Sequence, residues 1–113
     1  MDANQGDIVE TLENMGFSVL SLAAMGKGCP DLLVGSPHGN WLIEIKDGAK
    51  SPSRRKLTEK QEKFWNLWSG PIDRIETVDQ AIAWGQNVRR RGVSPSDGTR
   101  DVVRRTLSKS PGP

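Results

Sequence analysis

A chain of 113 residues, of which 35% are hydrophobic, is long enough for one compact domain and too short for two. It contains no stretch near the roughly 20 apolar residues of a membrane span, and its N-terminus lacks the basic start and apolar run of a secretory signal. The single cysteine, Cys29, excludes an internal disulfide and is typical of a reducing cytosol. We therefore expect a cytoplasmic protein that does not enter a membrane.

Charge is unevenly distributed along the chain. Residues 1–85 hold nine Lys or Arg against twelve Asp or Glu, a net of −3, whereas residues 86–113 hold seven against two, a net of +5. A basic tail on a mildly acidic body is typical of nucleic-acid binding, although such tails also serve solubility alone. We divide the chain into a domain at residues 1–86 and a basic tail at 87–113, mostly disordered, with a frayed helix near Val102–Leu107.

The first predicted element is a helix over residues 2–15. Its apolar residues recur at helical spacing and form one stripe: Ile8, Val9, Leu12 and Met15. Gly16 follows as a C-cap, and Asp2 or Asn4 caps the start. Gln5 lies on the buried stripe rather than on the solvent-exposed face.

Three strands are predicted next, over residues 17–24, 31–34 and 41–46, joined by a glycine-rich turn and a polar turn. Apolar and other residues alternate in the third strand, so Glu44 and Lys46 point to the same side of the sheet. A shared site needs this geometry.

The second half of the chain predicts a basic loop over 47–57, a helix, a strand and a last helix. Thr58 and Gln61 form a capping box that opens the first of these helices. The strand covers residues 72–76, and the last helix runs to about Gln86. The order α-β-β-β-α-β-α indicates an α/β protein with a central mixed β-sheet flanked by helices.

The central strands carry residues that suit phosphodiester chemistry. Asp31 and Glu44 are two oxygen ligands for a hard cation such as Mg²⁺, and the backbone carbonyl of Ile45 is a third. Lys46 is placed to polarise a water or stabilise developing charge. On spacing alone, a Glu and a Lys on a strand are more often solvated or paired, but their place in an otherwise apolar strand favours a site.

These residues also carry a family resemblance. Cys29-Pro30-Asp31 followed by Glu44-Ile45-Lys46 matches the PD-(D/E)xK nuclease signature, and the surrounding sequence resembles the small stand-alone phage and bacterial VRR-NUC proteins over roughly residues 2–85. The segments that support the resemblance are the helix ending in MGF, and GKGCPDLLVG, LIEIKDG and KLTEKQEKF. It implies a restriction-endonuclease-like core, Mg²⁺ or Mn²⁺ as cofactor, and cleavage of DNA in a bacterial or phage-infected cell. It also implies a homodimer that acts on branched DNA.

The resemblance assigns roles to particular residues. Asp31 and Glu44 would bind metal, Lys46 would be the catalytic lysine, and Gln61 matches a polar residue near the site, a role that competes with its capping box. Gln5 stands where the superfamily often has a metal-binding Glu, and a neutral amide binds a divalent cation more weakly. Glu10 is an alternative, although the helical phase points it elsewhere.

Several weaker candidates lie outside this group. Phosphate contacts are predicted for five basic residues, for which a merely solvated loop is the alternative: Lys27, Lys50, Arg54, Arg55 and Lys56. We expect Cys29 to be a small buried side chain and His38 an exposed turn residue. The tryptophans at helical spacing are more often core than base-stacking residues, and any that remain exposed suggest a dimer face: Trp65, Trp68 and Trp84.

Two main functional hypotheses follow. The first is a divalent-metal-dependent DNA endonuclease that hydrolyses phosphodiester bonds and selects branched or junction DNA. The second is a non-cleaving nucleic-acid-binding module of the same fold, with a metal site weakened by Gln5. A third class is a structural partner protein whose Trp-rich helix docks onto another chain.

Overall fold

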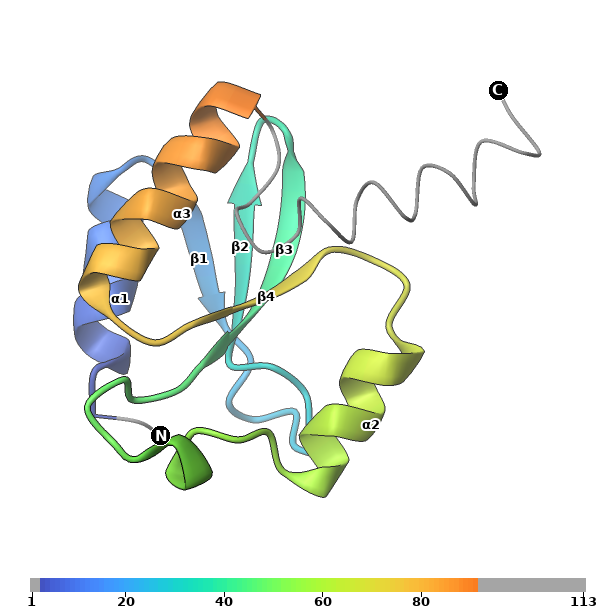
Figure 1. The fold of residues 1–113 in the computed structure, drawn as a ribbon. Coiled ribbons are helices and arrows are strands. Elements are labelled where there is room, and N and C mark those ends of the chain that lie inside the picture. The colour runs from blue at the N-terminus through green and yellow to red at the C-terminus, as the bar shows by residue number, and fades with distance from the viewer. Residues whose placement is uncertain (1–2, 92–113) are drawn as a thin grey trace.

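The structure, a computed structural model, describes residues 3–91. Along the chain the elements follow in this order: α1 (Gln5–Asn14), β1 (Ser18–Ser21), β2 (Leu32–Ser36), β3 (Gly39–Ile45), the 3₁₀ turn η1 (Pro52–Arg54), α2 (Glu59–Leu67), β4 (Ile72–Ile75) and α3 (Val78–Arg91). Figure 1 shows the sheet at the centre, with α1 and α3 together on one side and α2 at the opposite end. The predicted order of helices and strands is confirmed.

The four strands form one sheet in the order β1-β2-β3-β4. β1, β2 and β3 are antiparallel neighbours, and β4 pairs in parallel with β3. Parallel neighbours need a crossover connection, which η1 and α2 provide between β3 and β4. The predicted α/β class with a mixed sheet is therefore confirmed, and β3 lies between two partners.

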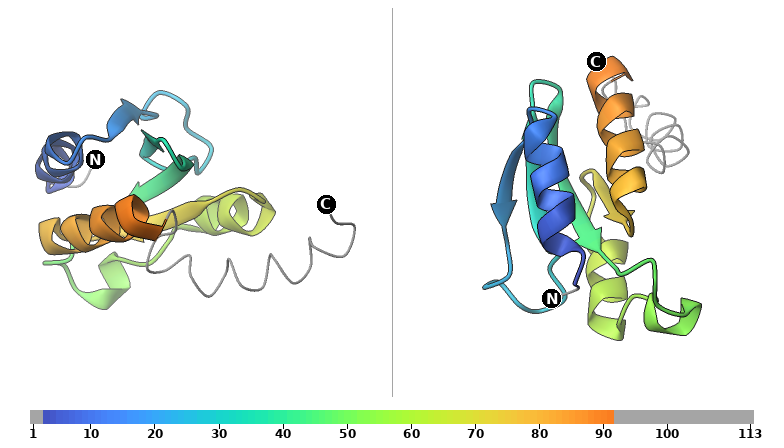
Figure 2. Two further views of the ribbon diagram at one scale, coloured as in Figure 1. Left: turned by 90° about the horizontal axis from the view of Figure 1, so that it is seen from above. Right: turned by 90° about the vertical axis from the view of Figure 1, so that its left-hand side faces the viewer.

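The core lies between the sheet and the pair of helices α1 and α3, which pack against each other (Figure 2). Ile43 and Ile45 point into it from β3, as the alternation in that strand predicts. Trp84 on α3 meets Trp41 edge-on, with ring centroids 5.7 Å apart and planes at 88°. The prediction that Trp84 belongs to the core is confirmed.

Helix α2 differs from α1 and α3 in its burial, because none of its residues is fully buried. Leu67 is 80% exposed, and Trp68, directly after the helix, is 41% exposed and stacks on Phe64 with centroids 5.4 Å apart. The expectation that Trp68 belongs to the core is wrong. Apolar spacing shows that these residues share a face of α2, but it does not show how far that face is covered: Phe64 is half-buried, whereas Leu67 and Trp68 are exposed.

Two helix ends also differ from the prediction. Asn4 precedes α1 but makes no side-chain cap hydrogen bond, and Asp2 lies outside the described residues. α3 continues beyond Gln86 to Arg91, because Val88 is fully buried against the core and its burial stabilises another helical turn. The rest of the predicted tail, with the helix near Val102–Leu107, lies outside the described residues.

Within residues 3–91, no helix has the length and apolar character needed to cross a membrane.

Candidate active site

A hydrogen bond holds the Asp31 side chain against the middle of the candidate motif on β3. It directly precedes β2, and since Leu32 pairs with Ile43, Asp31 falls opposite Glu44. Its Oδ2 accepts a hydrogen bond of 2.7 Å from the backbone N–H of Ile45, the residue between Glu44 and Lys46. One carboxylate oxygen thus fixes the side chain against the neighbouring strand.

Glu44 and Lys46 lie side by side in the protein rather than on a solvated face. They are 2% and 8% exposed, and Lys46 Nζ lies 3.9 Å from Glu44 Oε2. Burying two charged groups costs free energy unless they pair, form hydrogen bonds or bind a ligand. A solvated strand face is therefore excluded for this pair.

Gln61 joins the pair from helix α2. Its Oε1 accepts a hydrogen bond of 2.8 Å from Lys46 Nζ, and its Nε2 donates one of 3.1 Å to Glu44 Oε2. The same Oε1 accepts from the backbone N–H of Thr58 at 2.9 Å, and Thr58 Oγ1 accepts from the Gln61 N–H, so the predicted capping box is confirmed. Gln61 is both a capping residue and a neighbour of the buried pair.

The pKa of the Cys29 thiol is affected by two of the candidate site carboxylates. Partial burial raises the pKa of its thiol above the ordinary value, and the negative charges of Glu44 and Asp31 raise it further. The thiol is therefore neutral at pH 7.

The first turn of α1 reaches the same end of β3. The side-chain amide of Asn4 donates hydrogen bonds to the backbone carbonyls of Lys46, at 3.2 Å, and Glu76, at 2.8 Å. The next residue, Gln5, is 5% exposed, and its buried Oε1 has no hydrogen-bond partner among residues 3–91. An unsatisfied buried amide oxygen is costly unless it accepts from or binds something absent from the chain itself. Glu10, the alternative, is exposed.

Carboxylate and amide oxygens are the kind of ligand that a hard divalent cation prefers. Within the described part of the chain, no three His, Cys, Asp or Glu side chains cluster as metal ligands. A cation would therefore rely on the two carboxylates of Asp31 and Glu44, together with amide, backbone or water oxygens, which is a common ligand set for Mg²⁺. The role of the unsatisfied Oε1 of Gln5 as such a ligand stays a prediction. The carbonyl of Ile45 as a further ligand stays a prediction.

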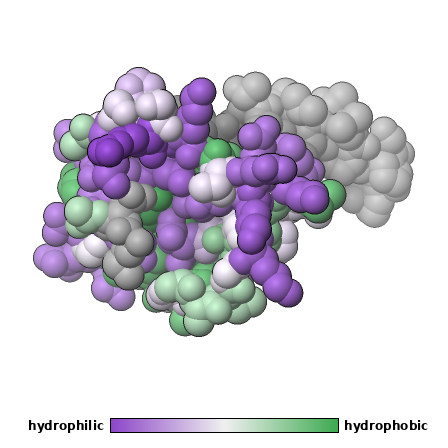
Figure 3. Space-filling model, turned by 90° about the horizontal axis from the view of Figure 1, so that it is seen from below, coloured by the Kyte–Doolittle hydropathy of each residue, from purple (hydrophilic) through white to green (hydrophobic). Residues whose placement is uncertain are grey.

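The basic residues predicted to contact phosphate are spread over two segments. Lys27 lies in the turn before β2, and Lys50, Arg54 and Lys56 lie in the exposed part of the loop after β3. Figure 3 shows the face on the side of η1 and α2 that is seen from below, where hydrophilic side chains predominate and hydrophobic areas are small. The phosphate contacts of these basic residues stay a prediction.

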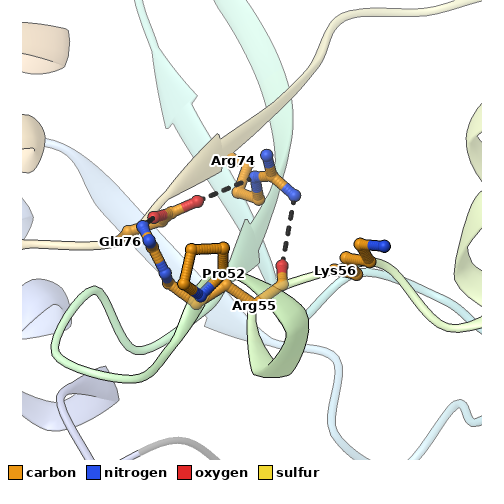
Figure 4. A pocket seen from close by; sticks show the side chains of 5 residues that line it. All are labelled: Pro52, Arg55, Lys56, Arg74 and Glu76. Carbon is orange, nitrogen blue, oxygen red and sulfur yellow. Dashed lines mark hydrogen bonds and ion pairs between the residues drawn. The ribbon is translucent and has the colours of Figure 1, made fainter.

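The charge of Arg55 is matched by a carboxylate within the fold. Its Nη1 lies 2.7 Å from Glu76 Oε1, while Arg74 Nε lies 3.1 Å from Glu76 Oε2 and Arg74 Nη1 donates to the Arg55 carbonyl (Figure 4). The Lys56 side chain extends away from this group. Arg55 thus ties the loop to β4, which weakens its case as a free phosphate contact.

Sequence reasoning missed Asn4 and Arg74. Asn4 was considered only as a helix cap, because nothing in the local pattern shows that its amide reaches β3 and β4. Arg74 pairs in register with Glu44, so it lies beside the site on the next strand. Only the parallel pairing of β3 and β4, which is a long-range feature, could have identified it.

Comparison with known proteins gives one structural likeness. A solved structure described as "VRR_NUC domain" is similar to this chain. The TM-score is 0.48 and the sequence identity 23%, and the match covers 80% of this chain and 98% of that one. The description names the family that the sequence motifs resemble. No family model and no curated protein matches the chain.

Proposed function

We propose that this chain is a divalent-metal-dependent endonuclease that hydrolyses phosphodiester bonds in DNA, with Mg²⁺ or Mn²⁺ as cofactor. The observation that carries the proposal is the buried pair Glu44 and Lys46, with Asp31 hydrogen-bonded to the peptide N–H between them. A carboxylate and an ammonium that are buried together, beside a second carboxylate that is half-buried, add little to the stability of a fold. A reaction centre explains the cost.

The carboxylates of Asp31 and Glu44, helped by the amide oxygen of Gln5, would hold the cation. When bound, the cation supplies positive charge to the phosphate and lowers the pKa of a coordinated water. Hydrolysis forms a bond between a water oxygen and phosphorus as that water gives up a proton, and it breaks a P–O bond, whose leaving oxygen takes up a proton. The protein must therefore orient the water and offset negative charge on the phosphate.

Lys46 is the residue placed for both tasks. Gln61 accepts one of the three ammonium protons and Glu44 Oε2 lies 3.9 Å from Nζ, so the side chain is held in place. A fixed ammonium stabilises charge more effectively than a flexible one, because it need not reorganise as the reaction proceeds. Gln61 is a positioning residue in this scheme.

The test is cleavage of supercoiled and four-way-junction DNA with Mn²⁺ or Mg²⁺. Asp31→Asn keeps an acceptor for the Ile45 N–H and removes only the charge, and Glu44→Gln and Lys46→Met likewise preserve size. Each should lower the cleavage rate by about 10²-fold or more. Glu59→Gln, an exposed carboxylate on α2, is the matched control and should cut normally. Undiminished cleavage by folded Glu44→Gln and Lys46→Met proteins would overturn the proposal.

A non-cleaving DNA-binding module is the second candidate, favoured by Gln5 as an amide where a third carboxylate would strengthen the metal site. Salt-sensitive DNA binding without any cleavage in Mn²⁺ would support it. Preference for branched DNA and a homodimer in solution stay predictions. Comparing linear, flapped and junction DNA, and measuring mass by sedimentation, would test them.

A further inference from the structure

A second feature lies between the turn at Lys27 and helix α2, next to Gln61 of the proposed active site. It is a pocket of about 310 Å³ lined by two residue types, lysines and hydrophobic side chains: Lys27, Lys60, Lys63, Phe64 and Leu67. We call it the lysine pocket. None of its lining residues is acidic, so three positive charges surround an apolar floor.

The lysine pocket is built from the two segments that also position the active site. Lys60 directly precedes Gln61 on α2, and Lys27 lies four residues before Asp31. The two segments touch at Gly28, where a Cβ would clash with the backbone carbonyl of Lys60 and come 2.9 Å from the Gln61 nitrogen. A ligand in the pocket is therefore next to Gln61 and the loop that leads to Asp31.

The backbone at Lys27 indicates that its position is required. Lys27 has φ +58 and is the only non-glycine residue with positive φ in the described part of the chain. It stands between Gly26 at φ +64 and Gly28 at φ +78. A left-handed conformation is unfavourable for a residue with a Cβ, and such outliers concentrate at functional sites. A glycine would suit this position better unless the ammonium is needed.

The floor of the pocket offers a fixed aromatic ring. Phe64 stacks on Trp68 with planes at 16°, so its orientation is set within α2 rather than by the core. Leu67 beside it is 80% exposed. An apolar floor ringed by cations is complementary to a ligand that has both a flat apolar face and negative charge. A nucleotide whose base is not paired has both, whereas a base inside a duplex hides its face.

We propose that the lysine pocket binds one unpaired nucleotide of the DNA strand next to the bond that is cut, with its base against Phe64 and its phosphates near Lys27, Lys60 and Lys63. The inference rests on the proposed nuclease function and narrows its substrate to DNA with an unpaired end or flap. It also gives a role to Leu67, which is exposed on α2.

The experiment compares two labelled DNAs, a blunt duplex and the same duplex with an unpaired extension, bound to the full chain in EDTA at fixed salt. The wild-type protein should bind the extended DNA about tenfold more tightly, the size of effect expected from stacking one base on an aromatic ring. Equal affinity for the two DNAs would overturn the proposal.

Variants locate the preference in the pocket. Phe64→Leu keeps an apolar side chain but removes the ring. The double variant Lys60→Gln with Lys63→Gln removes two charges. The single variant and the double variant should each abolish the preference for extended DNA. Lys27→Gly should do so while raising the melting temperature, because it relieves the left-handed strain. Arg89→Gln with Arg90→Gln removes two exposed charges from α3 and should keep the preference. An equal loss of preference in the α3 control would overturn the proposal.

The same DNAs with Mn²⁺ separate this inference from the nuclease proposal. Binding preference that depends on Phe64, without cleavage of either DNA, would support the lysine pocket and contradict the nuclease. Cleavage of both DNAs without a preference would do the reverse. If Leu67→Glu turned a dimer into a monomer while the preference for extended DNA was absent, the pocket would be a self-association surface and the proposal wrong.

Discussion

At the scale of single residues, Gln61 connects local structure to the proposed chemistry. One end of its amide, Oε1, accepts from the Thr58 backbone and from Lys46, and the other end, Nε2, donates to Glu44. The sequence offered capping and site roles for Gln61 as alternatives. They coexist because an amide has two ends and its oxygen has two lone pairs.

Substitutions at Gln61 should separate these roles. Gln61→Glu keeps the acceptor for Thr58 and Lys46 but loses the donor to Glu44 and adds a like charge beside it. We expect a loss of cleavage of about 10–100-fold, typical of residues that orient a metal site, with the helix cap retained. Thr58→Ala should cost about 1 kcal/mol of stability with a smaller effect on rate. Thermal melting and separate kcat and KM values distinguish the two, and equal rates for Gln61→Glu and wild type would contradict this role.

Gln5→Glu tests whether the buried amide oxygen faces the metal site. A carboxylate binds a divalent cation better than an amide, so Mn²⁺ affinity should rise, on the order of tenfold. Without metal, the buried charge should lower the free energy of unfolding by about 1–3 kcal/mol. Calorimetric Mn²⁺ titration and melting curves with and without Mn²⁺ measure both. Unchanged affinity would show that Gln5 lies away from the cation, and Glu10→Gln is the matched control.

At the scale of elements, the approach of the 26–31 loop to α2 determines how the site is assembled. Asp31 ends this loop, and Gly28 within it lies directly against the backbone of Lys60. No side chain separates the two segments there. The distance between the strand carboxylates and the helix that carries Gln61 therefore depends on a glycine.

Gly28→Ala and Gly26→Ala make a matched pair that tests this contact. Both residues have positive φ, so each alanine should cost about 1 kcal/mol in backbone strain. Only at residue 28 does the new Cβ collide with Lys60, whereas at residue 26 nothing lies within 4 Å. We expect Gly28→Ala to lose cleavage activity at least tenfold more than Gly26→Ala, beyond any difference in melting temperature. Equal activities would mean that the loop and α2 move independently.

Local patterns were sufficient for the elements whose signal lies in the sequence itself. Alternation along β3 predicted that Glu44 and Lys46 share a side, and the spacing of Thr58 and Gln61 predicted the start of α2. The exposure of Trp68 could not be predicted, because helical spacing does not show whether another element covers a face. The tether from Asn4 to the carbonyls of Lys46 and Glu76 spans 42 and 72 residues, so no local pattern reports it.

At the scale of the whole molecule, the last turns of α3 complete the core. Val88 is fully buried, although it stands among polar and basic residues that suggested a tail. The boundary predicted at residue 86 therefore divides a helix. Isolated apolar residues are weak signals of an element's end, because burial depends on what faces them.

Two truncations test where the folded domain ends. A chain that stops after Arg91 keeps all described elements and should melt as the full chain does. A chain that stops after Gln86 loses Val88 and should be less stable by about 1.5–3 kcal/mol, the value of burying one such side chain. Denaturant unfolding measures both. Full stability of the shorter chain would contradict the contribution assigned to Val88.

The exposed face of α2 has a consequence for how the protein behaves in time. Helix α2 has no fully buried residue, so we expect its local opening free energy to lie below that of the sheet. Each opening withdraws Gln61 from Lys46 while Asp31 and Glu44 stay in place. The arrangement with Gln61 bound to Lys46 is then one state of an ensemble. A DNA strand that touches both α2 and the 26–31 loop would increase the population of this state.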